Sequence, residues 1–159
     1  MKAAVLTISD GVAEGSREDK SGETLAALLG EEGYDVERRV MPDDRDTIAE
    51  AIAELADQAE LVLTTGGTGL GPRDVTPEAT AGILDRPAPG IAEAIRADSI
   101  AKTPHALLSR GLAGVRGQAL IVNLPGSPGG CRDGFEVLRP ALKHAVELLA
   151  GEPTAHRQT

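Results

Sequence analysis

An apolar segment that runs directly into a glycine-rich turn is the feature that most constrains the fold of this chain. Residues 61–65 (LVLTT) have the length and the β-branched character of a buried strand, and residues 66–71 (GGTGLG) follow at once. Thr76 and Pro77 are then typical of an N-cap and a first helical residue. Such a junction favours phosphate binding, because glycines let backbone N–H groups approach an anion closely. Asp74 adds a carboxylate where a metal-phosphate complex can be held.

Two well-known phosphate motifs do not fit this turn. A P-loop requires Lys and then Ser or Thr after the last glycine, whereas this chain has Pro72 and Arg73. The dinucleotide fingerprint also fails, because its third glycine would fall at Pro72. The alternative that the glycines only form a tight connection between strand and helix stays open. The length of the pattern, with its threonines and charged pair, favours a ligand site.

Apolar periodicity predicts that strands and helices alternate along the chain. Strands are expected at residues 2–9, 35–40, 61–65 and 119–123. Helices are expected at residues 22–32 after an N-cap at Ser21, around residues 48–55, and at 77–84, 90–101 and 140–150, the last beginning at Pro140. The type of residues 106–109 stays open. This alternation predicts an α/β fold with a largely parallel sheet covered on both faces.

Size and composition limit the number of domains and the kinds of partner. With 159 residues, of which 41% are hydrophobic, the chain is expected to form one domain over residues 1–151, followed by a frayed tail at 152–159. It shows no membrane-spanning stretch and no secretory signal, so we expect a cytoplasmic protein. Cys131 is the single cysteine, and the three histidines show no zinc-like spacing with it, so neither a disulfide nor a structural metal is expected.

The charge and the aromatic content argue against nucleic acid as a partner. The formal net charge is −9, whereas phosphate backbones are bound through clustered Lys and Arg. Tyr34 and Phe135 are the only aromatic residues, so the chain has no stacking platform for single strands. We therefore expect small-molecule ligands that are held by aliphatic and backbone groups.

Polar residues follow the predicted strands at the points where these strands end. They are Ser9 and Asp10, residues 42–44, residues 65–69 and residues 123–127. Ligands of open α/β sheets bind outside these carboxyl ends, so we expect one site for a nucleoside triphosphate and a second phosphorylated substrate. Asp43 and Asp74 would hold Mg²⁺, because carboxylates alone repel phosphate.

Each of these residues also has a plainer structural explanation. The acids can form turns or caps, and Ser109, Arg110 and Arg116 can belong to a polar surface turn. Cys131 is better explained as a small buried side chain than as a nucleophile. The shared location of the acids and hydroxyls at strand ends is what favours the site.

Several ordered motifs together give this chain a family resemblance that covers nearly its whole length. The motifs are residues 8–10 (ISD), 19–22 (DKSG), 42–43 (PD), 64–77, 108–110 (LSR), 114–117 (GVRG), 123–127 (NLPGS) and 138–145. The sequence resembles the molybdopterin adenylyltransferase family, which includes MogA, MoaB and the gephyrin G domain. The chain departs from some members at Gly71, Pro72 and Glu78, and it keeps the segment 73–76 (RDVT).

This resemblance implies a reaction, a site and an assembly. The reaction is transfer of AMP from ATP to the terminal phosphate of molybdopterin, with release of pyrophosphate and with Mg²⁺ as the metal. Asp43 and Asp74 match the family's catalytic and metal-binding acids. The nucleotide-binding and pterin-binding positions are Ser9, Asp10, Thr65, Gly66, Gly67, Thr68, Gly69, Gly71, Ser109, Arg110, Pro125, Gly126 and Ser127.

The resemblance further implies a three-layer α/β/α fold, in which a mostly parallel mixed sheet includes an antiparallel edge strand. It also implies a homotrimer and a contact with a molybdenum-insertion protein. Two other functions stay open: a non-catalytic protein of the MoaB type that binds or delivers molybdopterin, and a scaffold that only retains the fold.

Overall fold

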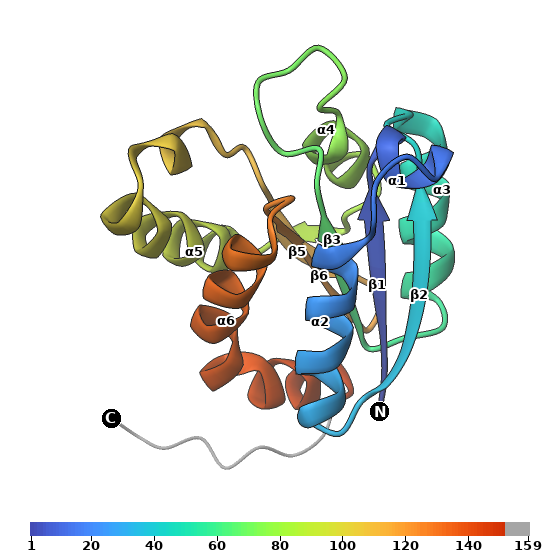
Figure 1. Ribbon diagram of the computed structural model, residues 1–159. Coiled ribbons are helices and arrows are strands. Elements are labelled where there is room, and N and C mark those ends of the chain that lie inside the picture. The colour runs from blue at the N-terminus through green and yellow to red at the C-terminus, as the bar shows by residue number, and fades with distance from the viewer. Residues whose placement is uncertain (152–159) are drawn as a thin grey trace.

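The protein is described by a computed structural model for residues 1–151, in which one six-stranded sheet lies between two layers of helices (Figure 1). The strands are β1 (Lys2–Ile8), β2 (Asp35–Met41), β3 (Leu61–Thr65), β4 (Arg86–Pro87), β5 (Ala113–Arg116) and β6 (Ala119–Leu124). They lie in the order β2-β1-β3-β6-β5-β4. Strands β2, β1, β3 and β6 are mutually parallel, and β5 is antiparallel to both of its neighbours. The predicted three-layer fold with a mostly parallel mixed sheet is confirmed.

Helices cover both faces of the sheet because its central strands are apolar on both sides. The helical segments are α1 (Asp10–Glu14), α2 (Lys20–Glu31), α3 (Arg45–Ala56), α4 (Thr76–Ala81), α5 (Pro89–Lys102), the 3-10 helix η1 (Pro104–Leu108) and α6 (Pro128–Leu149). Helices α2, α5 and α6 pack on the face that contains Val5 of β1, and α3 and α4 pack on the face that contains Leu6. Successive residues of one strand thus enter two separate cores, as the period of two requires. None of the helices described for residues 1–151 has the length and apolar character that crossing a bilayer requires.

Two predicted helix caps were wrong, since both helices begin earlier than expected, with Asp19 and Val75 at the N-cap positions. Helix α2 begins at Lys20, and its N-cap is Asp19, whose Oδ1 accepts a hydrogen bond from the N–H of Gly22 at 3.0 Å. Ser21 is a buried helical residue. Helix α4 begins at Thr76 without a side-chain cap, because the hydroxyl of Thr76 instead donates to the carbonyl of Gly66 at 2.9 Å. That bond fastens the glycine turn to the helix.

The predicted break at Pro140 was also wrong, since α6 is continuous from Pro128 to Leu149. A proline inside a helix removes one N–H donor and crowds the preceding turn. Pro140 lies on the exposed side of α6, where water can satisfy the freed carbonyl, while Leu138 and Leu142 on either side are buried in the core. Burial of the apolar stripe therefore outweighs the local preference for a break.

The region after residue 102 differs most from the expectation. Residues 106–109, whose type was left open, lie in and just after η1. Strand β5, which was not recognised from periodicity, is short and contains Gly114. It is the antiparallel strand of the sheet, but the edge itself is formed by the two residues of β4, so the expectation of an antiparallel edge strand was wrong in position by one strand. The predicted tail at residues 152–159 lies outside the described residues.

Candidate active site

The glycine turn after β3 is held tightly between the ends of three structural elements. Gly66 and Gly67 have φ angles of +100° and +68°, a region that favours glycine. A Cβ atom at Gly66 would lie 2.2 Å from the carbonyl oxygen of Ile8, at the end of β1. The N–H of Gly66 donates to the carbonyl of Leu124 in β6 at 3.2 Å, and the N–H of Thr76 donates to the carbonyl of Gly67 at 3.1 Å. Only glycine allows this close approach at residue 66.

Asp43 and Asp74 line the same cavity, which has a volume of about 300 Å³ and is called the acidic pocket below. The residues predicted for the site that line it are Ser9, Asp43, Thr65, Gly66, Gly67, Asp74 and Gly126. Arg17 and Lys20, which sequence reasoning missed, add positive charge to the lining. Arg17 lies in the segment that joins α1 to α2, and Lys20 is the first residue of α2; no phosphate motif marks either residue. The carboxyl ends of β1, β2 and β3 therefore meet around one cavity, whose acidic residues are Asp43, Asp74 and Glu18.

The two carboxylates are held in place by backbone N–H groups and keep oxygens for a ligand. Asp43 Oδ2 accepts from the N–H of Asp10 at 2.9 Å, and Asp74 Oδ2 accepts from the N–H of Gly71 at 2.9 Å. Within residues 1–151, the Oδ1 atom of each acid accepts no hydrogen bond. Burial, and then the negative charges of Asp10 and Asp74, raise the pKa of Asp43 above its usual range. A cation between the acids would remove this repulsion.

Asp10 supports the acidic pocket from outside its lining. Its Oδ1 accepts from the N–H of Asp43 at 3.0 Å, so the two residues bond reciprocally. Arg73 binds the Asp10 carboxylate through Nε at 2.6 Å and Nη2 at 3.0 Å, and it also donates to the carbonyl of Asp43 at 3.1 Å. These bonds, first that from Arg73, hold the pKa of Asp10 below its usual range. Asp10 is thus an ionised link between the ends of β1 and β2 and the loop that carries Arg73.

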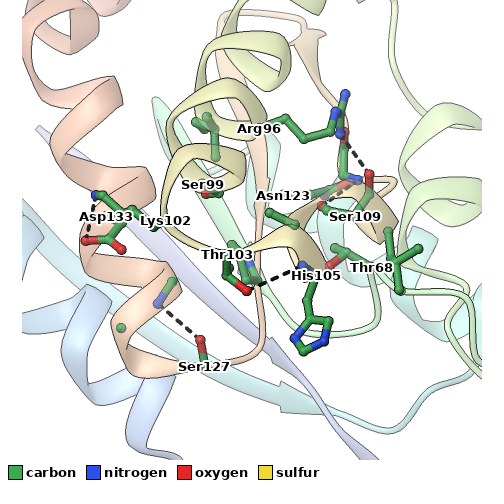
Figure 2. A pocket seen from close by; sticks show the side chains of 18 of the residues that line it. Thr68, Arg96, Ser99, Lys102, Thr103, His105, Ser109, Asn123, Ser127 and Asp133 are labelled. Atoms are coloured by element: carbon green, nitrogen blue, oxygen red, sulfur yellow. Dashed lines mark hydrogen bonds and ion pairs between the residues drawn. The ribbon is translucent and has the colours of Figure 1, made fainter.

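A second cavity of about 480 Å³ adjoins the first and is called the α5 pocket below (Figure 2). The residues predicted for the site that line it are Thr68, Gly69, Ser109, Pro125 and Ser127. Helix α5 and η1 add polar groups that sequence reasoning missed, namely Arg96, Ser99, Lys102, Thr103 and His105. These residues belong to a helical segment without any ligand motif, so only the packing of α5 beside the loop after β6 brings them into the site.

Three polar side chains in the α5 pocket are fixed by their contacts. Arg96 Nη1 donates to the carbonyls of Ser109 and Gly111, each at 3.1 Å, and thereby holds the segment that follows η1. Ser127 is the N-cap of α6, and its hydroxyl accepts from the N–H of Gly130 at 3.1 Å. Lys102 forms an ion pair with Asp133 at 3.2 Å on the same wall. The pocket therefore combines an apolar lining with a few oriented polar groups, as small-molecule sites do.

The two pockets share a wall made of the glycine turn and the loop after β6. Gly66 and Gly67 line the acidic pocket, whereas Thr68 and Gly69 line the α5 pocket. A Cβ at Gly126 would lie 3.4 Å from the Cα of Gly66, so the two loops are in direct contact. A ligand that reaches across this wall can contact both cavities.

Not every predicted residue lines one of these pockets. Asp10, Gly71 and Arg110 lie outside both linings. Cys131 is fully buried, and burial raises the pKa of its thiol to about 11, so it is no nucleophile at neutral pH. Its Sγ lies 3.3 Å from the hydroxyl of Thr65 and within hydrogen-bond distance of the carbonyl of Pro125, so it packs the wall from behind.

Comparison with known proteins places the chain in a family. The sequence profile of a family described as a probable molybdopterin-binding domain matches residues 4–144. The chain belongs to this family. The resemblance that its motifs indicated is thereby confirmed.

Three relatives show how far this likeness extends. A molybdopterin adenylyltransferase of Helicobacter pylori (strain J99) is 39% identical over 152 residues, which are 92% of this chain and 86% of that protein. The molybdenum cofactor synthesis protein cinnamon of Drosophila melanogaster is 42% identical over 98% of this chain, which spans only 26% of that longer protein. The crystal structure of the molybdopterin biosynthesis enzyme MoaB from Thermus thermophilus has a TM-score of 0.88 and 44% identity, covering 96% of this chain and 98% of that one.

Proposed function

We propose that the protein acts in molybdenum cofactor biosynthesis as a Mg²⁺-dependent molybdopterin adenylyltransferase. It would transfer AMP from ATP to the terminal phosphate of molybdopterin and release pyrophosphate. The observation that carries this proposal is the acid pair of Asp43 and Asp74 in a pocket whose glycine-turn wall also borders a second, larger pocket. The relatives named as molybdopterin adenylyltransferases support the same activity.

The donor set around the acid pair fits Mg²⁺ that arrives with a nucleotide. Asp43 and Asp74 each keep an oxygen that accepts no hydrogen bond within the described residues, and their mutual repulsion contributes to the raised pKa of Asp43. Residues 1–151 hold no cluster of three or more His, Cys, Asp or Glu side chains with ligand geometry. Mg²⁺ commonly uses one or two carboxylates and takes its other ligands from phosphates and water. When bound, the metal would neutralise phosphate charge during the transfer.

The residues of the two pockets suggest how the substrates are arranged. The phosphates would lie in the acidic pocket, near the N–H groups of the glycine turn and the side chains of Arg17 and Lys20. A heterocyclic ring would occupy the α5 pocket, which has the larger volume and the more apolar lining. A phosphate oxygen of molybdopterin would attack the α-phosphorus of ATP, and the bond to the β-phosphate oxygen would break. Because the attacking phosphate is already ionised at neutral pH, the chain needs to orient it rather than deprotonate it.

Incubation with ATP, Mg²⁺ and molybdopterin tests the proposal directly. We expect adenylylated molybdopterin and pyrophosphate in equal amounts, and product formation that depends on both the metal and the pterin. Asp74→Ala should abolish the reaction and leave the fold intact. Asp85→Ala is the matched control, because Asp85 also accepts a backbone N–H, from Gly117 at 2.7 Å, and lies outside both pocket linings.

Two results would contradict this proposal, the first its activity and the second the role of the acid pair. One is a wild-type protein that forms neither product while a known adenylyltransferase forms both under the same conditions. The other is full activity of Asp74→Ala, since the acid pair would then have no part in the transfer.

The likeness to MoaB supports a second candidate function, namely a non-catalytic protein that binds or delivers molybdopterin. The same pockets would then hold the pterin without nucleotide turnover. Calorimetry distinguishes the two functions: tight binding of molybdopterin together with no release of pyrophosphate from ATP selects the delivery protein.

The remaining sequence expectations belong to this proposal as well. Residues 1–151 would act as one domain, the protein would work in the cytoplasm as a homotrimer, and it would contact a molybdenum-insertion protein. The family resemblance supports the trimer. Sedimentation equilibrium is the test, and a monomer at all concentrations would contradict it.

A further inference from the structure

The loop of residues 69–74, which carries Asp74, has few internal contacts, and the side chain of Arg73 ties its last turn to Asp10 and to the carbonyl of Asp43. Its two internal hydrogen bonds join Gly71 and Asp74: the N–H of Gly71 donates to Asp74 Oδ2, and the N–H of Asp74 donates to the carbonyl of Gly71 at 3.0 Å. Residues 70–73 are exposed, and the side chain of Leu70 packs against no core. The position of the Asp74 carboxylate therefore depends on contacts that reach the loop from elsewhere in the fold.

Arg110 provides such contacts at both ends of the loop. Its Nε donates to the carbonyl of Gly69 at 2.8 Å, and its Nη2 donates to the carbonyl of Asp74 at 2.8 Å. Its Nη1 donates to Glu78 Oε1 in the first turn of α4. The backbone N–H of Arg110 also donates to the carbonyl of Thr68 at 2.8 Å. One residue thus joins the glycine turn, the carbonyl of the catalytic acid and the helix that follows.

These contacts leave Arg110 little capacity to bind a substrate. All three guanidinium nitrogens donate to protein groups, and the residue lies outside both pocket linings. Glu78 balances its charge, and the hydrogen bond from Arg110 keeps the pKa of Glu78 below its usual range, so the pair stays ionised at neutral pH. The planar fork of an arginine can hold two carbonyls and a carboxylate at once, which the single ammonium group of a lysine cannot do with the same geometry.

We propose that Arg110 is a positioning residue, which fixes both ends of the loop of residues 69–74 and thereby places the Asp74 carboxylate in the acidic pocket without contacting substrate. The catalytic consequence rests on the proposed adenylyl transfer, whereas the structural consequence can be measured without it.

Hydrogen exchange in the substrate-free protein tests the structural part. The variants are Arg110→Gln and Arg110→Lys, and the matched control is Arg116→Gln. Like Arg110, Arg116 donates from its guanidinium to the backbone, namely to the carbonyl of Ile83 at 3.0 Å, but it does not contact the loop. We expect the amides of Gly71 and Asp74, which donate the two hydrogen bonds within the loop, to exchange about 10-fold faster in Arg110→Gln, less so in Arg110→Lys, and at the wild-type rate in Arg116→Gln. Unchanged exchange of these amides in both Arg110 variants overturns the proposal. If Arg110→Gln does not fold, Arg110→Lys supplies the measurement.

Steady-state kinetics then separates positioning from substrate binding. Displacing Asp74 should lower kcat by about 10- to 100-fold and raise the Mg²⁺ concentration for half-maximal activity. The KM values for ATP and molybdopterin should stay within about 3-fold of wild type. A large rise in either KM at unchanged kcat, together with unchanged exchange of the loop, would show that Arg110 contacts substrate and would refute the proposal. If the wild-type protein transfers no AMP, the proposed function fails, and the exchange result still decides the role of Arg110.

Discussion

Replacing Gly66 with alanine is expected to destabilise the protein through the turn that joins its two pockets. The φ angle of +100° is one that alanine adopts only with strain, at about 1–3 kcal/mol. The added Cβ would also lie 2.2 Å from the carbonyl oxygen of Ile8. That oxygen belongs to the backbone at the end of β1, so relief requires a shift of the strand end or the turn, at about 1–3 kcal/mol for an overpacked site. Together the two effects predict a loss of about 2–6 kcal/mol, and a loss of about 3 kcal/mol lies in the lower half of that range.

Thermal and urea unfolding of Gly66→Ala check this value. For a chain of this size, about 3 kcal/mol corresponds to a fall in Tm of about 6–12 °C. Gly30→Ala is the matched control, since Gly30 lies inside α2, has no positive φ, and has open space around its Cβ position. We expect this control to gain about 0.5–1 kcal/mol, because alanine is the better helix former. A Tm of Gly66→Ala within about 1 °C of wild type would refute the argument from φ and close approach.

Three further predictions concern the acid pair, the buried thiol and the polar core. Burial and the charges of Asp10 and Asp74 raise the pKa of Asp43 in the folded state, so this carboxylate lowers stability once the pH rises through that pKa. Thermal scans of Asp43→Asn should show a Tm above wild type at pH 7 and no gain below about pH 4, which is the pKa of an aspartate in the unfolded chain. A Tm below wild type at pH 7 would contradict this. With a pKa of about 11, Cys131 should not react with a thiol reagent at pH 8 until urea unfolds the protein, and equal rates in both states would disprove its burial. Asn123→Ala should lower the free energy of unfolding in urea by about 2–4 kcal/mol, because the Asn123 side chain forms hydrogen bonds with three polar groups. An unchanged midpoint of urea unfolding would exclude that role.

The fold could be predicted from the sequence wherever local pattern and burial agree. The segment of residues 61–65 is apolar throughout because β3 is covered on both faces, so a short apolar run sufficed to identify it. Strand β5 gave no such signal, since four residues including Gly114 carry too little alternation, and the strand exists because β6 lies beside it. Pro140 shows the opposite case: a proline favours a break in the helix, but burial of the apolar side chains of α6 outweighs this local preference.

Some residues of the candidate site could be predicted from local sequence, and others are brought into it only by tertiary packing. Asp43 and the glycine turn follow the ends of β2 and β3 closely, so parallel pairing predicts that they meet. Asp74 lies further along the chain, at the end of the loop after the turn, and tertiary contacts of that loop bring it to the same pocket. Arg96 and Lys102 could not be predicted, because they lie on a helix without a motif and reach the site only through the packing of α5 against α6. The contacts of Arg110 also depend on tertiary structure, since its partners come from the glycine turn and α4.

The charges around the acidic pocket favour a ligand site over a purely structural role for Asp43 and Asp74. Two carboxylates beside the acidic pocket are paired with arginines: Arg73 binds Asp10, and Arg110 binds Glu78. Asp43 and Asp74 have no such partner within residues 1–151, although both arginines lie close by in the structure. Without a ligand, burial and then repulsion from Asp10 and Asp74 disfavour the ionised form of Asp43, which raises its pKa and reduces stability at neutral pH. A variant that gains stability at pH 7 and loses AMP transfer, as expected of Asp43→Asn, would show that the repulsion is kept for a bound cation and its phosphates.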